Sequence, residues 1–224
     1  MKFAQTNGGR GAVKEGSSLI DKLTDDLQPV RPVGRGLGLG ILLWFCLSTA
    51  YVVTTSSLLG PIRPGVLDQL LAHPRFLLET LLGVAAIAIL AQAGLRSAVP
   101  AALPRHWLLF TLGVTLLWLL NYPLGFFSPS LEPSMLGKRP HCYLETLILA
   151  LPPALAAIYW QNRLFPLKPL QSAAIAGLAA GMIPALYMQI ACMYAPGHIL
   201  MWHILPGALM ALLAVPISLC IKAL

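Results

Sequence analysis

The chain has 224 residues, of which 57% are hydrophobic and 10% are charged, and its formal net charge is +7 at pH 7. A soluble globular protein has about 25% charged residues, so this composition excludes that class. The positive charge follows the loops between apolar segments and reports membrane topology, so nucleic-acid binding is not required to explain it. We expect a membrane protein that contacts the lipid bilayer and makes no direct contact with nucleic acid.

Residues 1–35 are predicted to form a polar segment ahead of the first membrane span. Within it, residues 17–28 have the pattern of a short amphipathic helix, with capping-box spacing near its start and a proline just after its end. The residues of its two faces are Ile20, Leu23 and Leu27 on the apolar side and Asp21 and Asp26 on the acidic side. A helix on a membrane surface usually has a basic polar face, whereas a docking helix fits its apolar face into the groove of a soluble partner. The residues alone leave both interpretations open.

Six apolar segments follow, each close to the roughly 20 residues that cross a bilayer as a helix. They predict an all-α membrane domain over residues 36–224, with spans at about 37–58, 76–95, 107–127, 142–160, 172–194 and 199–221. The fourth segment contains Pro152-Pro153. We still expect a helix there, because proline is tolerated in a membrane helix when its neighbours satisfy the freed backbone groups.

The distribution of Lys and Arg predicts the orientation of these spans. If the N-terminus is cytoplasmic, eleven of the 15 Lys and Arg residues fall on the cytoplasmic side. The other four are Arg63, Arg75, Lys138 and Arg139. Positive residues are enriched in cytoplasmic loops, so we expect both termini in the cytoplasm.

Two cysteines and two histidines fall on the outer side in this topology. Cys142 opens the fourth span, Cys192 lies near the end of the fifth, and His198 and His203 flank the start of the sixth. The two thiols could form a disulfide in an oxidising compartment. As a reduced pair they could bind a soft or borderline metal, with one of the histidines completing the ligand set.

A third interpretation is that the four residues have unrelated structural roles. A cysteine in a membrane helix is often only a small apolar residue, and Cys46 and Cys220 fit that description because they have no polar neighbours. His203 could hydrogen-bond a backbone carbonyl that the nearby Pro206 leaves free. The sequence favours a paired role for Cys142 and Cys192 and leaves the histidines as candidate ligands.

Glu79 and Glu145 are the carboxylates within the predicted spans. Ionisable groups inside a membrane are functional candidates. Both residues lie near the start of their spans, where Arg75 could pair with Glu79 and where the helix dipole favours a negative charge. A structural role therefore competes with a functional one. Motifs of common catalytic sites, such as Cys-x-x-Cys, His-Glu-x-x-His and Gly-x-Ser-x-Gly, are absent from the sequence, so we do not expect an enzyme.

Several short strings stand in a distinctive order along the chain. They are Leu19-Ile20-Asp21-Lys22-Leu23 with Asp26-Leu27-Gln28-Pro29-Val30, His73-Pro74-Arg75-Phe76-Leu77-Leu78-Glu79, Cys142 with Leu151-Pro152-Pro153, Ala176-Gly177-Leu178-Ala179-Ala180-Gly181, and Cys192 with Trp202-His203-Ile204-Leu205-Pro206. Each string alone is weak. Their order and spacing within a six-span frame resemble the NrsF family, the negative regulators of sigma-F type extracytoplasmic-function sigma factors.

The resemblance implies a non-enzymatic anti-sigma factor of the bacterial inner membrane. Its N-terminal segment would hold an extracytoplasmic-function sigma factor. Cys142 and Cys192 would sense metal or oxidative stress, and the sigma factor would then be released. This interpretation suggests a transition-metal ion as the cofactor, held by Cys142, Cys192 and His203. The chain departs from the family in its longer polar N-terminal extension and in having His141 and His198 near the cysteines.

The alternative is a membrane thiol oxidoreductase or a metal transporter that uses the same outer Cys and His groups. An oxidoreductase needs a close reactive dithiol and usually a quinone pocket. A transporter needs polar groups through the middle of the membrane, and the first, third, fifth and sixth spans are nearly devoid of them. Both alternatives are therefore disfavoured.

Overall fold

The computed structural model describes Thr24 and residues 34–222. The predicted docking helix at residues 17–28 lies outside these residues apart from Thr24. The predicted roles of its side chains therefore stay predictions; they concern Ile20, Asp21, Leu23, Asp26 and Leu27.

Six helices are long and apolar enough to cross a membrane, as the sequence predicts, and β-strands are absent from the described residues. Their bounds are Gly34–Leu59 (α2), Pro74–Arg96 (α4), Arg105–Leu124 (α5), Cys142–Arg163 (α6), Pro169–Ala191 (α7) and a last span composed of Pro196–Ile199 (α8), Leu200–Ile204 (η1) and Leu205–Lys222 (α9). A short helix, Val66–Ala72 (α3), lies between the first two spans. Many large apolar side chains face outward, among them Leu47, Leu58 and Leu212. The chain is therefore an all-helical, multi-pass membrane protein.

Proline marks the start of several helices and does not break the ones it interrupts. Pro74, Pro169 and Pro196 stand in the first turn of α4, α7 and α8, where the missing backbone N–H costs nothing. Helix α6 continues through Pro152 and Pro153, as the sequence analysis expects.

Helix α7 occupies the centre of the bundle, in contact with α4, α6 and α9. Small residues allow this close approach. A Cβ atom added to Gly181 would lie 2.0 Å from the carbonyl oxygen of Gly207 in α9, and one added to Gly94 in α4 would lie 3.0 Å from the backbone of Ala176. In a bilayer no hydrophobic force drives helices together, and glycine and alanine at the contacts let their backbones approach closely enough to pack.

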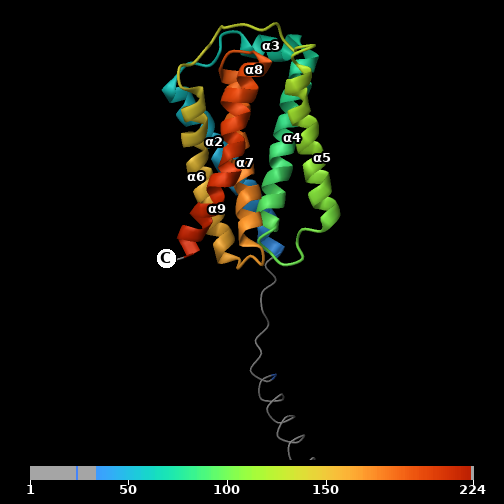
Figure 1. Cartoon of the computed structure of the whole chain (residues 1–224), viewed down its shortest axis with the longest axis vertical. Coiled ribbons are helices and arrows are strands. Elements are labelled where there is room, and N and C mark those ends of the chain that lie inside the picture. The colour runs from blue at the N-terminus through green and yellow to red at the C-terminus, as the bar shows by residue number, and fades with distance from the viewer. Residues whose placement is uncertain (1–23, 25–33, 223–224) are drawn as a thin grey trace, which may run out of the picture. The chain divides into compact units, whose positions relative to one another are not determined.

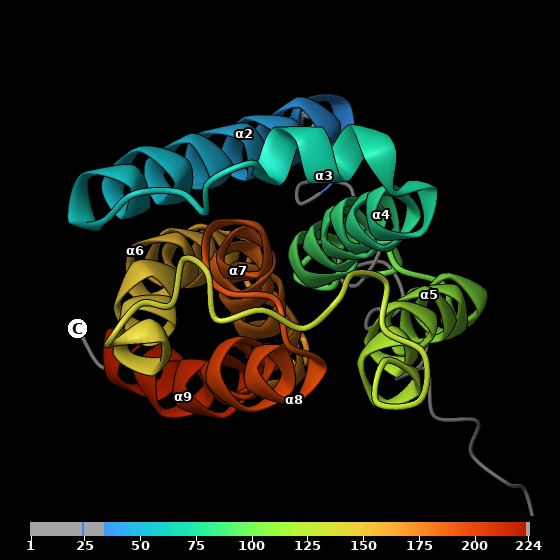
Figure 2. The same cartoon turned by 90° about the horizontal axis from the view of Figure 1, so that it is seen from above.

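Helix α2 lies along one side of the bundle, inclined to the other helices (Figure 2). Its side chains reach the bundle at a few points: the indole of Trp44 donates to the carbonyl of Pro153 at 3.1 Å, and Ser57 hydrogen-bonds Tyr187 at 2.8 Å.

The spans alternate in direction, so one end of the bundle holds the last residues of α2, α5 and α7 and the first residues of α4, α6 and α8 (Figure 1). We call this the thiol end, because Cys142 and Cys192 lie there. Helix α3 and the connection between α5 and α6 run across it (Figures 1 and 2).

Candidate metal and redox site

The structure brings together the four residues that the sequence singled out. One ligand atom from each of Cys142, Cys192, His198 and His203 lies within 4.8 Å of the others. The two sulfur atoms are 3.1 Å apart, and the sulfur of Cys192 is 3.6 Å from Nε2 of His198. Both cysteines are free thiols and are buried.

The cysteines are positioned by the ends of two packed helices. Cys142 is the first residue of α6, and Cys192 follows the last residue of α7 and donates its backbone N–H to the carbonyl of Met188. Because α6 and α7 pack against each other in opposite directions, the start of one meets the end of the other. Two residues 50 positions apart in the sequence therefore share one site.

The histidines are positioned by a π-helical segment. His203 lies in η1, where the N–H of Leu205 bonds the carbonyl of Leu200, five residues earlier. His198 and His203 are also five residues apart, and their rings meet at 5.0 Å between centroids in an edge-to-face contact. Segments of this kind are rare and often occur at functional sites. An α-helical reading of the sequence did not predict this segment.

His203 is the residue whose surroundings most need an explanation. Its side chain is completely buried, and neither ring nitrogen has a hydrogen-bond partner among the described residues. The predicted alternative, a hydrogen bond from His203 to a carbonyl freed near Pro206, is therefore wrong. Buried polar atoms are nearly always paired, so an unpaired imidazole beside two thiols fits a metal ligand. Two sulfur and two imidazole donors are a set that zinc-like ions prefer.

The thiol of Cys192 is within hydrogen-bonding distance of Cys142 and His198. The hydrogen bond from Cys142 lowers the pKa of the Cys192 thiol, and burial opposes this effect. Cys192 is therefore the sulfur that carries negative charge more readily. A thiolate is the form of cysteine that binds metals and attacks oxidants.

Arg63 supports the backbone around Cys192 and was not predicted as a site residue. It is 2% exposed, its Nη1 donates to the carbonyl of Cys192 at 3.2 Å, and its N–H donates to Ala191 at 2.9 Å. Its guanidinium lies 5.5 Å from the ring of Phe76 and 5.9 Å from that of Tyr194. Burial lowers the pKa of Arg63, while the nearby Cys192 and Tyr194 act in the opposite direction.

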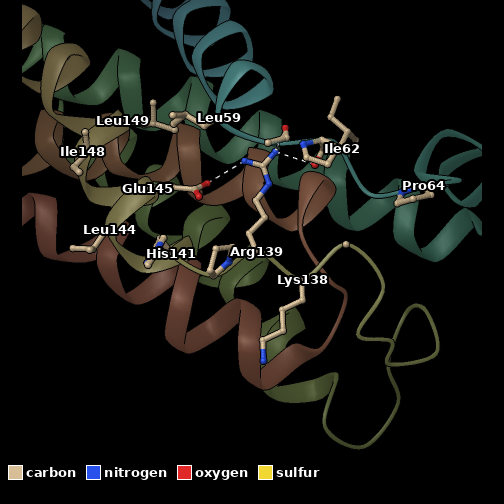
Figure 3. A pocket seen from close by; sticks show the side chains of 14 residues that line it. Leu59, Ile62, Pro64, Lys138, Arg139, His141, Leu144, Glu145, Ile148 and Leu149 are labelled. Atoms are coloured by element: carbon tan, nitrogen blue, oxygen red, sulfur yellow. Dashed lines mark hydrogen bonds and ion pairs between the residues drawn. The ribbon is translucent and has the colours of Figure 1, made fainter.

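Glu145 takes the structural role that the sequence left open. It forms an ion pair of 3.0 Å with Arg139, which is 6% exposed. Arg139 also accepts a hydrogen bond of 3.4 Å at its carbonyl from the thiol of Cys142. Figure 3 shows its guanidinium between Glu145 and the chain at Ile62, in the wall of a cavity of about 650 Å³. The sequence analysis counted Arg139 only as a loop charge.

Glu79 lies in a separate polar network. It is 4% exposed and accepts hydrogen bonds from Ser130 at 2.6 Å and from Gln189 at 2.8 Å. The ion pair with Arg75 considered above is not formed, because Arg75 donates to Ser128. Glu79 therefore joins α4 to α7 and does not belong to the Cys and His cluster.

Fold and site together describe a multi-pass helical membrane protein with a buried cluster of two thiols and two imidazoles at one end. The model of a family described as negative regulator of sigma F, NrsF, matches residues 23–219. The chain belongs to this family, and its role is that of a negative regulator of a sigma factor. The matched region contains all four residues of the cluster and most of the chain. Searches of curated proteins and of solved structures returned no match.

Proposed function

We propose that the chain is an anti-sigma factor of the bacterial inner membrane that releases an extracytoplasmic-function sigma factor when a soft or borderline divalent metal binds its thiol end. Cys142, Cys192, His198 and His203 would be the ligands. The observation that carries this proposal is the convergence of four ligand atoms within 4.8 Å, one of them on a buried histidine without a partner among the described residues. Binding would release the thiol protons, because thiolates are the forms that hold metal.

The predicted topology supports separate sites for sigma binding and for sensing. The excess of Lys and Arg favours the N-terminal segment on the cytoplasmic side, where a sigma factor is found, and it places the thiol end on the opposite side. The acidic amphipathic helix predicted at residues 17–28 would be the part of the chain suited to dock into a partner's groove. The family match begins at residue 23, within that predicted segment.

The first experiment measures metal binding by the full chain in detergent or nanodiscs. We expect one Cd²⁺ or Zn²⁺ per wild-type chain, and a dissociation constant that rises at least about tenfold in the Cys142→Ser/Cys192→Ser variant. The matched control is Cys46→Ser/Cys220→Ser, which removes two exposed cysteines and should leave affinity unchanged. Equal affinity of the two double variants would refute the metal site.

A disulfide switch is the competing sensing chemistry, and the sulfur separation of 3.1 Å favours it. In that reaction the two thiols lose two protons and two electrons to a two-electron oxidant and form one S–S bond. His203 distinguishes the two chemistries, because a disulfide does not need it. If metal is the signal, His203→Leu should abolish metal-dependent release and spare release by diamide. Wild-type release by Cd²⁺ in His203→Leu would exclude His203 as a ligand, and release of the sigma factor by diamide but not by Cd²⁺ in the wild type would assign sensing to oxidation.

The second experiment tests the docking segment. The full chain is co-expressed and co-purified with a candidate extracytoplasmic-function sigma factor from the same genome. Leu23→Asp/Leu27→Asp should abolish co-purification, because charges on the apolar face prevent its burial. Asp25→Asn is the control and should retain the partner, because Asp25 falls on the acidic face of the predicted helix. Co-purification of the Leu23→Asp/Leu27→Asp variant would contradict the docking model.

A thiol oxidoreductase remains the second candidate because the close dithiol that it requires is present. Such an enzyme would reoxidise its thiols and turn over repeatedly. Incubating the reduced chain with a quinone and a reduced dithiol peptide distinguishes the two functions. An anti-sigma factor should oxidise no more than stoichiometric peptide, whereas catalytic peptide oxidation would favour the enzyme.

A further inference from the structure

We propose that Arg139 couples the thiol pair to the end of helix α2, and through α2 to the N-terminal segment that precedes it in the chain. This inference rests on the proposed function and concerns how the same site is read out. Arg139 would act as a positioning residue, since it contacts Cys142 through its backbone carbonyl and would itself give no ligand atom to the metal.

The backbone of Arg139 contacts the sensing thiol. Its carbonyl oxygen accepts the S–H of Cys142 at 3.4 Å, and the same sulfur is 3.1 Å from Cys192. The proton of Cys142 therefore lies near two acceptors.

The side chain of Arg139 contacts the first span. Its guanidinium donates to the carbonyl of Ser56 at 3.2 Å and to Oγ of the same residue at 3.1 Å. It also donates to the carbonyls of Gly60 at 2.5 Å and Pro61 at 3.0 Å, while Glu145 of α6 holds it from the other side at 3.0 Å. We call this set the Arg139 clamp: Arg139 with Ser56, Gly60, Pro61 and Glu145. Figure 3 shows the guanidinium reaching across from the start of α6 to the chain beyond α2.

A signal at the thiols removes the donor that holds the backbone of Arg139. A sulfur that binds a metal or joins a disulfide has lost its proton, and that proton leaves to solvent. The carbonyl of Arg139 then faces an electron-rich sulfur without a hydrogen atom between them, which is unfavourable for a buried oxygen. The peptide at Arg139 must turn or move, and the guanidinium on the same residue moves with it.

Helix α2 is suited to carry this movement. It is a continuous helix of 26 residues, Gly34–Leu59, so its two ends are about 39 Å apart at 1.5 Å per residue. The clamp holds one end, and the other end directly follows the segment predicted to bind the sigma factor. Cavities of about 190 Å³ lie along α2, one beside α4 and one between α4 and α7, and these leave room for the helix to shift. Movement of a rigid helix between two packings is a known form of transmission in proteins.

The test measures how strongly metal changes sigma affinity in the full chain. In the wild type, we expect saturating Cd²⁺ to weaken sigma binding by at least about tenfold. In Arg139→Gln the clamp is already open, so sigma binding should be weak without metal and should change less than about twofold when metal is added. Cd²⁺ should still bind, because all four ligands are retained. Lys138→Gln is the control, since the ammonium of this neighbouring exposed residue has no ion pair among the described residues, and it should behave as wild type.

Arg139→Lys sharpens the test. A lysine keeps the charge, but its single ammonium cannot reach five acceptors as a planar guanidinium does, so the response to metal should be intermediate. If Arg139→Gln shows the wild-type response to metal, the coupling proposal is wrong while the proposed function stands. If the wild type itself does not release the sigma factor, the proposed function fails instead.

A second measurement on the wild type needs no variant. Hydrogen exchange of the full chain should accelerate on Cd²⁺ addition in peptides covering residues 54–65, at the end of α2 and the loop after it. Peptides from the middle of α7, which is packed on several sides, should not change. Unchanged exchange at residues 54–65 with metal bound would overturn the coupling proposal, also in the case that Arg139→Gln does not fold.

Discussion

Helices α7 and α2 are both apolar membrane spans, but different interactions hold them in the bundle. In α7, 72% of the most apolar stretch is buried, against 28% in the first span. Helix α7 meets the backbone of its neighbours through glycine and alanine, whereas α2 is attached by side-chain contacts: the hydrogen bonds of Trp44, Ser56 and Ser57, and the ring of Trp160 against Gly40. Close backbone packing cannot be loosened by small steps, while hydrogen bonds can be exchanged. The contrast indicates a rigid core that presents the thiols and a peripheral helix that can respond to them.

The largest expected effect comes from breaking the rigid core at Gly181. The substitution Gly181→Val places a Cβ 2.0 Å from the carbonyl oxygen of Gly207, and a backbone atom has no rotamer by which to move away. We expect a loss of about 3 kcal/mol or more in the free energy of unfolding, seen as loss of monodisperse protein in detergent. Gly113→Val is the control, because no atom lies within 4 Å of the added Cβ. A stable Gly181→Val protein would contradict the close packing of α7 on α9.

The next prediction concerns the polar contact within that core. Glu79→Leu introduces an apolar side chain of similar size and leaves the donors of Gln189 and Ser130 without an acceptor. At about 1–3 kcal/mol for each of the two unsatisfied groups, the loss should be roughly 2–6 kcal/mol. Glu79→Gln keeps an acceptor oxygen and should cost about 1 kcal/mol or less. Thermal unfolding in detergent measures both, and equal midpoints would mean that shape alone holds α4 to α7.

The six spans and the Cys and His cluster could be predicted from the sequence. Apolar segment lengths predicted all six spans, because a bilayer fixes the length of a helix that crosses it. Alternating helix direction then predicted that Cys142, Cys192, His198 and His203 share one end. These conclusions need only the chain order and the membrane, and the structure confirms that the four side chains meet.

The sequence did not predict the hydrogen-bond partners of the long polar side chains. Arg75 and Glu79 are four residues apart on one helix, a spacing that favours an ion pair, yet Glu79 is bound by Gln189, 110 residues away. The burial of Glu79 selects donors that tertiary packing brings to it. The same holds for Arg139, whose contacts with Ser56 depend on where α2 lies against α6. The π-helical segment that turns His203 inward likewise has no signature in apolar periodicity.

A smaller effect is expected where α2 meets α6. Trp44→Phe keeps the ring but removes the hydrogen bond of 3.1 Å to Pro153, so the expected loss is about 1 kcal/mol. For a chain of this size that corresponds to a fall of about 2–4 °C in the unfolding midpoint. Trp107→Phe, on an indole that is 41% exposed, should leave the midpoint unchanged. A similar fall in both variants would show that Trp44 contributes only bulk.

The smallest change should come from Ser57, and its comparison with Ser56 separates the Arg139 clamp from general attachment of α2. The two serines are neighbours at the same end of the helix. Ser56 is completely buried and its Oγ accepts from Arg139 at 3.1 Å, whereas Ser57 is exposed and bonds Tyr187 at 2.8 Å.

Ser57→Ala loses a hydrogen bond that water can replace, so stability should change by no more than about 0.5 kcal/mol, and metal should release the sigma factor as in the wild type. Ser56→Ala removes one of the acceptors in the clamp and leaves the backbone carbonyls. The ratio of sigma affinities without and with metal should therefore fall several-fold, which corresponds to a loss of about half of the coupling free energy at most. Sigma affinity measured with and without Cd²⁺ in the two variants decides the matter. If Ser57→Ala weakens the response as much as Ser56→Ala, any attachment of α2 suffices and Arg139 has no special part in the coupling.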